Sequence, residues 1–252
     1  MEACWAAPLG ECQGKRSREH IVSAGLWDGP SVTVVGLPWC KSEPKTVGVS
    51  SATARILCQR HNSLLSGADT AGTNAFRALK NAALLTEKRR GMRPRKWKVV
   101  RYEIDGLGLE QWFLKTLINV SVAHPKDGVW ALSGTPLGRP PLGFIRASFG
   151  LSPLQRPLGL YAAGAVGEDV KYMDGVEIRT LLQPDGALAG ALFTFLGFRF
   201  FLNLQDGVVP ATFRLPSGDG WLASSVLYHI SRLNGKVAGK LSHFVQFLWN
   251  LQ

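Results

Sequence analysis

The pattern of apolar and polar residues in the second half of the chain predicts strands with one or two helices. Apolar and polar residues alternate over Val99–Ile104, as in a β-strand, and Asp105-Gly106 is a typical turn. Helical spacing follows over Leu109–Val122, with apolar residues at 109, 112, 113, 114, 117, 118 and 120. Further β-prone runs are separated by glycine and proline and lie at 129–132, 176–182, 191–204 and 208–215. The segment 239–251 fits an amphipathic helix or a final strand.

The first half shows a different pattern. Two β-prone runs within 18–35 are split by Gly25–Pro30, which predicts a long hairpin or two linked strands. A helix is expected to begin near Ser50–Thr53 or at Cys58. Apolar residues then recur at helical spacing from 64 to 79, with an interruption expected near Ser66-Gly67 or Gly72. The predicted class is α+β, with a small zinc-stabilised module at 1–85, a basic linker at 86–98 and a β-rich domain of unknown role at 99–252.

The charge and the composition of the chain indicate which classes of partner to expect. The net charge is +11 and the pI is about 9.8, which favours a polyanionic partner, most often nucleic acid. The longest apolar stretch, 186–204, contains three glycines and Arg199, so it is interpreted as buried strand and no membrane association is expected. The N-terminus lacks the basic and apolar regions of a signal peptide, and a reducing cytoplasm is the expected compartment.

All four cysteines lie within the first 58 residues, at Cys4, Cys12, Cys40 and Cys58. Such a cluster is more typical of metal binding than of a disulfide framework. Cys58 and His61 form a Cys-x-x-His pair at a helix start, and structural Zn²⁺ needs a second pair. Cys4 and Cys12 are the favoured pair, with Cys40 as the competitor for either position. The alternative is that the cysteines are small buried hydrophobic residues.

The densest basic run lies at residues 87–98, where seven of twelve residues are Lys or Arg. One interpretation is a solvated linker. The other is a strip that contacts phosphates, with an aromatic ring available for base stacking. The residues predicted to bind nucleic acid on that interpretation are Arg89, Arg90, Arg93, Arg95, Lys96 and Trp97.

The order Glu19-His20-Ile21, then Cys58-Gln-Arg-His61-Asn62, resembles the HNH (ββα-metal, treble-clef) nuclease family over roughly residues 1–75. The resemblance implies metal-dependent hydrolysis of phosphodiester bonds in DNA, or less commonly RNA. It implies that His20 is the general base and that Glu19 and Asn62 hold a catalytic Mg²⁺ or Mn²⁺. Asp69, two helical turns after Asn62, is expected to hold the metal or to orient His20.

One feature of the family's motif is missing. The stretch Ser50–Arg55 contains no asparagine at the place of the motif's middle Asn, where Ser51 or Thr53 offers a hydroxyl instead. The alternative function is therefore a non-catalytic, zinc-dependent module that binds nucleic acid or another protein.

Overall fold

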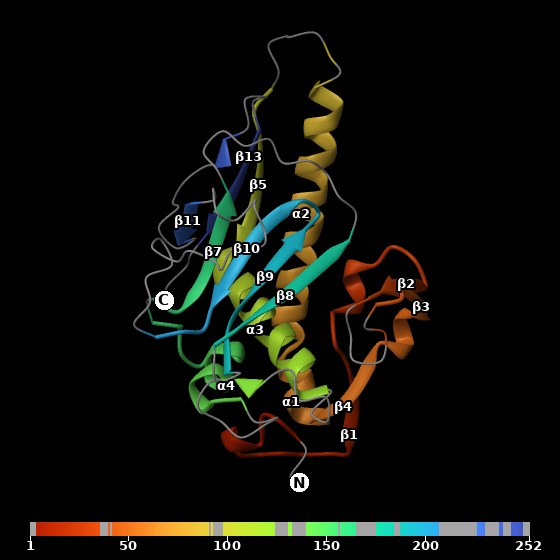
Figure 1. Cartoon of the computed structure of the whole chain (residues 1–252), viewed down its shortest axis with the longest axis vertical. Helices are drawn as coiled ribbons and strands as arrows, with labels where there is room; N and C mark the ends of the chain where they lie inside the picture. The colour runs from red at the N-terminus through yellow and green to blue at the C-terminus, as the bar shows by residue number, and fades with distance from the viewer. Residues whose placement is uncertain are drawn as a thin grey trace. The chain divides into compact units, whose positions relative to one another are not determined.

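Helices and strands both build the computed structural model of this chain, in agreement with the predicted α+β class (Figure 1). The structure describes residues 4–35, 40, 42–90, 92, 98–123, 131–132, 140–155, 157–164, 175–183, 187–206, 226–229, 237–238 and 243–248. Among these residues, no helix combines the length and the apolar character that a membrane crossing needs.

The helices begin and end close to their sequence signals. They are α1 (Gln59–Leu64), α2 (Ser66–Arg90), α3 (Gly106–Ala123) and α4 (Leu142–Ser148), with short 3₁₀ turns η1 (Ala7–Leu9), η2 (Ala24–Leu26) and η3 (Val49–Ser51). The helix predicted over 109–122 is confirmed by α3. Cys58 is the N-cap of α1, so the later of the two predicted starts is confirmed. The interruption falls at Leu65, one residue before the predicted Ser66-Gly67.

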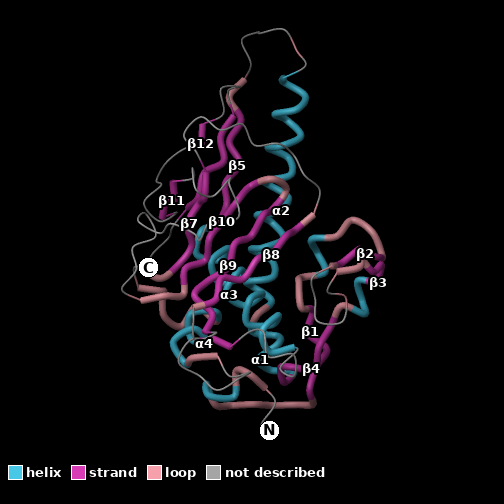
Figure 2. The backbone as a smooth tube through the Cα atoms, in the orientation of Figure 1, coloured by secondary structure: helices cyan, strands magenta, loops and turns pink. Residues whose placement is uncertain are grey.

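The strands, which Figure 2 distinguishes from the helices, account for most of the predicted β-prone runs. They are β1 (Arg16–His20), β2 (Ser31–Val34), β3 (Lys45–Gly48), β4 (Thr53–Cys58), β5 (Val100–Asp105), β6 (Ala131–Leu132), β7 (Gly159–Gly164), β8 (Val176–Leu182), β9 (Ala187–Phe195), β10 (Phe198–Asn203), β11 (Val226–His229), β12 (Val237–Ala238) and β13 (His243–Leu248). The segment 239–251 thus contributes a final strand, not a helix. The run predicted at 208–215 lies outside the described residues.

The two β-prone runs within 18–35 do not form a hairpin with each other. β1 pairs with β4 in antiparallel fashion, and β2 pairs with β3. The physical reason is the segment between β1 and β2, where η2 and the Gly29-Pro30 turn redirect the chain. The pairing makes β4 a strand where the sequence offered a helix start near Ser50–Thr53. It also brings residues 16–20 beside the strand that leads directly into α1.

β9 and β10 form a tight hairpin. Phe195 pairs with Phe198, and the two residues between them, Leu196 and Gly197, have φ values of 53° and 89°. Positive φ at both positions is the backbone of a type I′ turn, which matches the twist of antiparallel strands. β10 also pairs with β7, so these three strands lie side by side in one sheet (Figure 2). This arrangement explains the apolar stretch 186–204 as buried strand.

The chain divides into two compact units, and each combines separate segments. Unit 1 comprises 1–73, 111–153 and 183–188, and unit 2 comprises 74–110, 154–182 and 189–252. This division differs from the predicted boundaries at 86–98. The first five residues of the predicted linker are the last turn of α2, which continues to Arg90.

Aromatic and aliphatic side chains form the core of each unit. In unit 1, Trp112 is fully buried and its ring packs against Gly72, where a Cβ atom would lie 2.3 Å from the ring carbon Cγ. The glycine is therefore required by the close approach of the ring. In unit 2, the rings of Phe76 and Phe195 meet edge to face with centroids 4.9 Å apart.

Candidate metal centre

The junction of β4 and α1 places Cys58 and His61 on the same side of the chain. Cys58 is in extended conformation and caps α1, and the backbone N–H of His61 donates to its sulfur at 3.5 Å. The next helical turn then brings the imidazole back, so that Nδ1 of His61 lies 3.2 Å from Sγ of Cys58. A Cys-x-x-His at a helix start produces this pair because residues i and i+3 share a helix face.

The N-terminal segment supplies the other two sulfurs. Sγ of Cys4 lies 3.5 Å from Nδ1 of His61, and Sγ of Cys12 lies 3.6 Å from the same atom. The seven residues between the cysteines turn back through η1 and through positive φ at Gly10 (83°) and Glu11 (54°). The wide Cys-x7-Cys spacing is closed in this way. An ion pair between Glu11 and Arg60 joins the turn to α1.

The four donor atoms are arranged as a metal would need them. The sulfurs of Cys4, Cys12 and Cys58 and a nitrogen of His61 all lie within 4.8 Å of one another. For Zn–S of about 2.3 Å and Zn–N of about 2.0 Å, a tetrahedron separates sulfur from nitrogen by roughly 3.5 Å. The three sulfur–nitrogen distances of 3.2–3.6 Å agree with that value. The group predicted from the sequence is confirmed as a cluster that suits a metal ion such as zinc.

Cys40, the competing ligand, is buried and free but is not part of this cluster. Across the residues that the structure describes, the cluster is the single group of three or more Cys, His, Asp or Glu side chains that suits a metal.

Without a bound cation, the environment of the cluster favours neutral thiols at Cys4 and Cys12. Burial raises the pKa of Cys4, and it raises the pKa of Cys12 to about 12, with a further contribution from the neighbouring Cys4. Burial also acts to raise the pKa of Cys58, but hydrogen bonds from the backbone of His61 and Gln13 outweigh it and the pKa is lowered. Burial lowers the pKa of His61 and so favours the neutral imidazole, the form that binds metals. A divalent ion is the charge that lets three adjacent thiolates coexist.

The two carboxylates expected to hold a catalytic ion form ion pairs with a lysine instead. Glu19 is buried, and its Oε1 lies 2.5 Å from Nζ of Lys115 in α3. Oδ1 of Asp69 lies 2.6 Å from the same ammonium. Burial raises the pKa of Glu19, and the charge of Lys115 opposes that effect. The two predicted metal-binding carboxylates therefore converge in unit 1, and they converge on a buried lysine.

Further polar side chains complete this buried network. Ser23 donates its hydroxyl to Asp69, and Nε1 of Trp112 donates to the Ser23 oxygen at 2.8 Å. Asn119 donates to Glu19 at 3.1 Å and to the backbone carbonyl of His20 at 3.2 Å. Lys115 and Asn119 were missed at the sequence level, although a lone lysine within the apolar run Trp112–Val120 signals a buried acidic partner.

The remaining predicted residues are placed as follows. His20 ends β1 half-buried and pairs in register with Thr53, while Asn62 lies within α1. Within the described part of the chain, no side-chain hydrogen bond joins Asn62 to Glu19 or His20. The catalytic roles of these residues stay predictions.

The basic strip is described only at its start. Arg89 is buried near the end of α2, and its Nη2 donates to the backbone carbonyl of Lys98 at 2.9 Å. This contact gives Arg89 a structural role in unit 2. Arg90 is the last residue of α2. Arg93, Arg95, Lys96 and Trp97 lie outside the described residues, and their role in binding stays a prediction.

Comparison with known proteins adds no relative to this picture. No family model matches the chain. No curated protein and no solved structure matches it either. The resemblance to the HNH family therefore rests on the residues quoted above, and the cluster of Cys4, Cys12, Cys58 and His61 is the feature on which a function is best built.

Proposed function

We propose that this chain is a zinc-stabilised nucleic-acid-binding protein whose HNH-like N-terminal segment does not cleave its ligand. Zn²⁺ is the proposed metal because three thiolates and one imidazole form a closed tetrahedral set typical of structural zinc sites. With four protein ligands the ion keeps no open position for water, so its contribution is to the folding of the N-terminal segment.

The position of Lys115 is the observation that supports a segment without catalytic activity. A divalent ion that activates or stabilises a phosphodiester needs carboxylate oxygens at about 2.0–2.1 Å. The ammonium of Lys115 lies between Glu19 and Asp69 at 2.5 and 2.6 Å, and its side chain is 1% exposed. Because that buried ammonium already occupies the space beside both carboxylates, a metal ion would have to displace it. The absence of an asparagine in Ser50–Arg55 supports the same interpretation.

Nucleic acid is proposed as the ligand because of charge. A net charge of +11 on 252 residues attracts polyanions, and phosphate contacts supply most of non-specific nucleic-acid affinity. The interaction is expected to weaken steeply with salt, since each phosphate contact releases counterions.

A nuclease is the second candidate, favoured by the order of elements around the metal cluster. β1 pairs with β4 in antiparallel fashion and α1 follows β4 directly, with His20 at the end of β1. This order of two paired strands and a helix is compatible with a ββα arrangement and supports the second candidate. In this candidate His20 would act as general base on water and the treble-clef zinc site would remain structural.

One experiment separates the two candidates. Zinc-loaded protein and a His20→Ala variant are incubated with supercoiled plasmid in Mg²⁺ or Mn²⁺, and binding of labelled duplex DNA, single-stranded DNA and RNA is measured by fluorescence anisotropy. We expect salt-dependent binding and equal, background-level nicking by the two proteins. Nicking that disappears in His20→Ala would establish the nuclease, and an absence of binding to all three nucleic acids would overturn the proposed ligand.

A further inference from the structure

A β-bulge interrupts the pairing of β1 with β4 in unit 1. Ser17 pairs with Leu57 and Glu19 pairs with Ala54, so a single residue of β1, Arg18, faces two residues of β4. Those two residues are Arg55, which is exposed, and Ile56, which is buried. Bulges of this kind redirect side chains and are frequent beside functional sites.

The bulge places two positive charges across from each other. Arg18 and Arg55 are both exposed, and like charges on facing positions of paired strands repel. Neither guanidinium has an acidic partner among the side chains that the structure describes. The nearby carboxylate of β1, Glu19, is buried with Lys115. Both guanidinium groups therefore keep their hydrogen-bond donors available for an anion.

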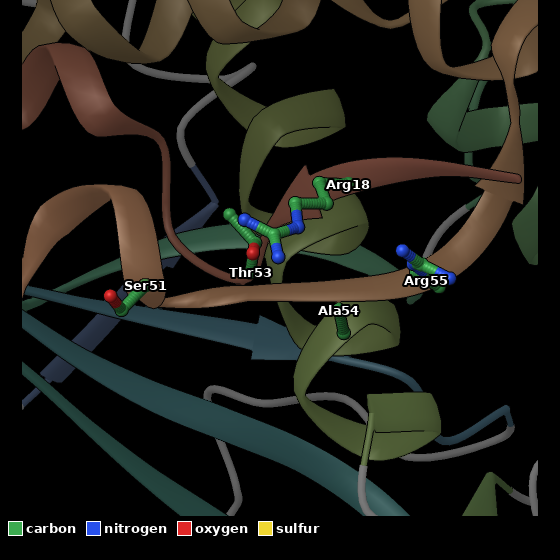
Figure 3. Close-up of a pocket in the computed structure, with 5 residues that line it drawn as sticks. All are labelled: Arg18, Ser51, Thr53, Ala54 and Arg55. Carbon is green, nitrogen blue, oxygen red and sulfur yellow. The ribbon is translucent and has the colours of Figure 1, made fainter.

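Two hydroxyl groups lie in the same hollow. A pocket of about 320 Å³ is lined by Arg18, Ser51, Thr53, Ala54 and Arg55 (Figure 3). The guanidinium of Arg18 turns toward Thr53 in this view, and Ser51 stands at the other end of the pocket from Arg55. This volume lies at the small end of the range for ligand sites, roughly 300–1,000 Å³. Ala54 contributes little bulk between the polar groups.

We infer that this pocket is a phosphate-binding site and that, given the proposed function, it holds a backbone phosphate of nucleic acid. Guanidinium groups donate paired N–H groups to phosphate oxygens, and hydroxyls add further donors. Contacts to phosphate oxygens carry no information about the base, so the site contributes affinity and orientation, not sequence preference. It is distinct from the zinc ligands and from the predicted basic strip.

The test compares three variants of the full zinc-loaded chain. Arg18→Gln/Arg55→Gln removes both charges from the pocket. Arg77→Gln/Arg146→Gln removes two exposed charges elsewhere and serves as the matched control. Thr53→Val removes one hydroxyl without changing the charge or the β-strand preference. Binding of a labelled duplex and of a labelled single strand is measured by anisotropy over a series of salt concentrations, with zinc content as the check of folding.

The pocket variant should lose on the order of tenfold in affinity at 0.15 M salt, and its salt slope should fall by about one, because one phosphate contact is lost. Thr53→Val should lose about two- to tenfold with an unchanged salt slope, as for one hydrogen bond. The control should change much less. If the pocket variant matches the control in affinity and slope, the phosphate site is overturned while the proposed function stands.

A different result separates the site from the function. If the natural sequence binds neither of these oligonucleotides nor RNA, the proposed ligand is overturned. The phosphate site is then tested by comparing thermal unfolding in inorganic phosphate and in chloride at equal ionic strength. A phosphate-dependent rise in melting temperature that disappears in the pocket variant supports a site for free phosphate groups. An equal response of the two proteins overturns the site as well.

Discussion

The ammonium of Lys115 lies 2.5 Å from the carboxylate of Glu19, although the two residues are 96 positions apart in the sequence. Asp69 approaches the same ammonium at 2.6 Å, so one buried positive charge is shared by two acids. Partners in a buried ion pair depend on each other more than an exposed pair does, because each charge has lost its water. The shared lysine is the reason for the proposed lack of catalysis, and its loss should destabilise the protein.

Lys115→Met should lower the free energy of unfolding by about 3–5 kcal/mol, because two acids are left in unit 1 without their cation. Denaturant unfolding measures the loss. The triple variant Lys115→Met/Glu19→Gln/Asp69→Asn removes the uncompensated charges and should regain a large part of it. A triple variant no more stable than the single variant would show that Lys115 acts by packing and not by charge.

The proposed zinc site predicts how much metal the purified protein contains. About one equivalent of Zn²⁺ should copurify with the protein, measured by elemental analysis, because structural zinc contributes directly to folding. Cys58→Ala and His61→Ala should lose the metal and leave the N-terminal segment poorly folded. Cys40→Ser is the control, since Cys40 is buried but is not a ligand. A metal-free preparation that is fully folded would contradict the assignment.

Two glycines of α2 should respond in opposite ways to alanine. At Gly72 a Cβ would lie 2.3 Å from the ring of Trp112, and at Gly67 it would meet nothing within 4 Å. Gly72→Ala should therefore destabilise the protein by about 1–3 kcal/mol through overpacking. Gly67→Ala should be neutral or stabilising by up to about 1 kcal/mol, because alanine favours the helix. Thermal unfolding of the two variants compares them directly, and equal effects would contradict the close packing of Trp112.

Glu110 predicts a pH-dependent loss of stability. Burial raises its pKa from the ordinary 4.5 to about 7, although the backbone N–H of Leu160 donates to its carboxylate at 2.8 Å. Because the folded-state pKa is the higher one, the folded protein holds the extra proton, and the contribution of Glu110 to stability is fully present only below pH 4.5. The contribution is lost as the pH rises toward 7, by about 3 kcal/mol.

Glu110→Gln isolates this contribution. The difference in unfolding free energy between the variant and the natural sequence should grow in favour of the variant from pH 5 to pH 7, and should then level off. Chemical denaturation at several pH values measures the difference. A difference that is constant over this range would show that Glu110 titrates normally in the folded protein.

The local signals in the sequence were sufficient for the metal cluster and for the main elements. Cys58 and His61 needed only a helix start to face each other, and the strand at 176–182 and the helix at 109–122 followed from the period of their apolar residues. These features depend on neighbours in the chain. The closing of Cys4 onto Cys12 required only a turn, which Gly10 supports.

Long-range pairing could not be obtained in the same way. The sequence contains nothing local to show that β1 pairs with β4 and not with β2, because the choice depends on packing across about forty residues. The partner of Glu19 was missed for the same reason. An acid beside a histidine is compatible with a metal site, and the lysine that neutralises it comes from a helix far along the chain.

The interleaved composition of unit 1 has a consequence for synthesis on the ribosome. The four ligands of the metal cluster have all been made once residue 61 has been added, whereas Lys115 follows 54 residues later. Chains fold progressively as they emerge, so the proposed zinc ion would organise the N-terminal segment while Glu19 and Asp69 are still open to water. A truncated chain of the first 85 residues would leave these carboxylates without Lys115. Early metal capture followed by late charge neutralisation is the folding order that this arrangement of the chain favours.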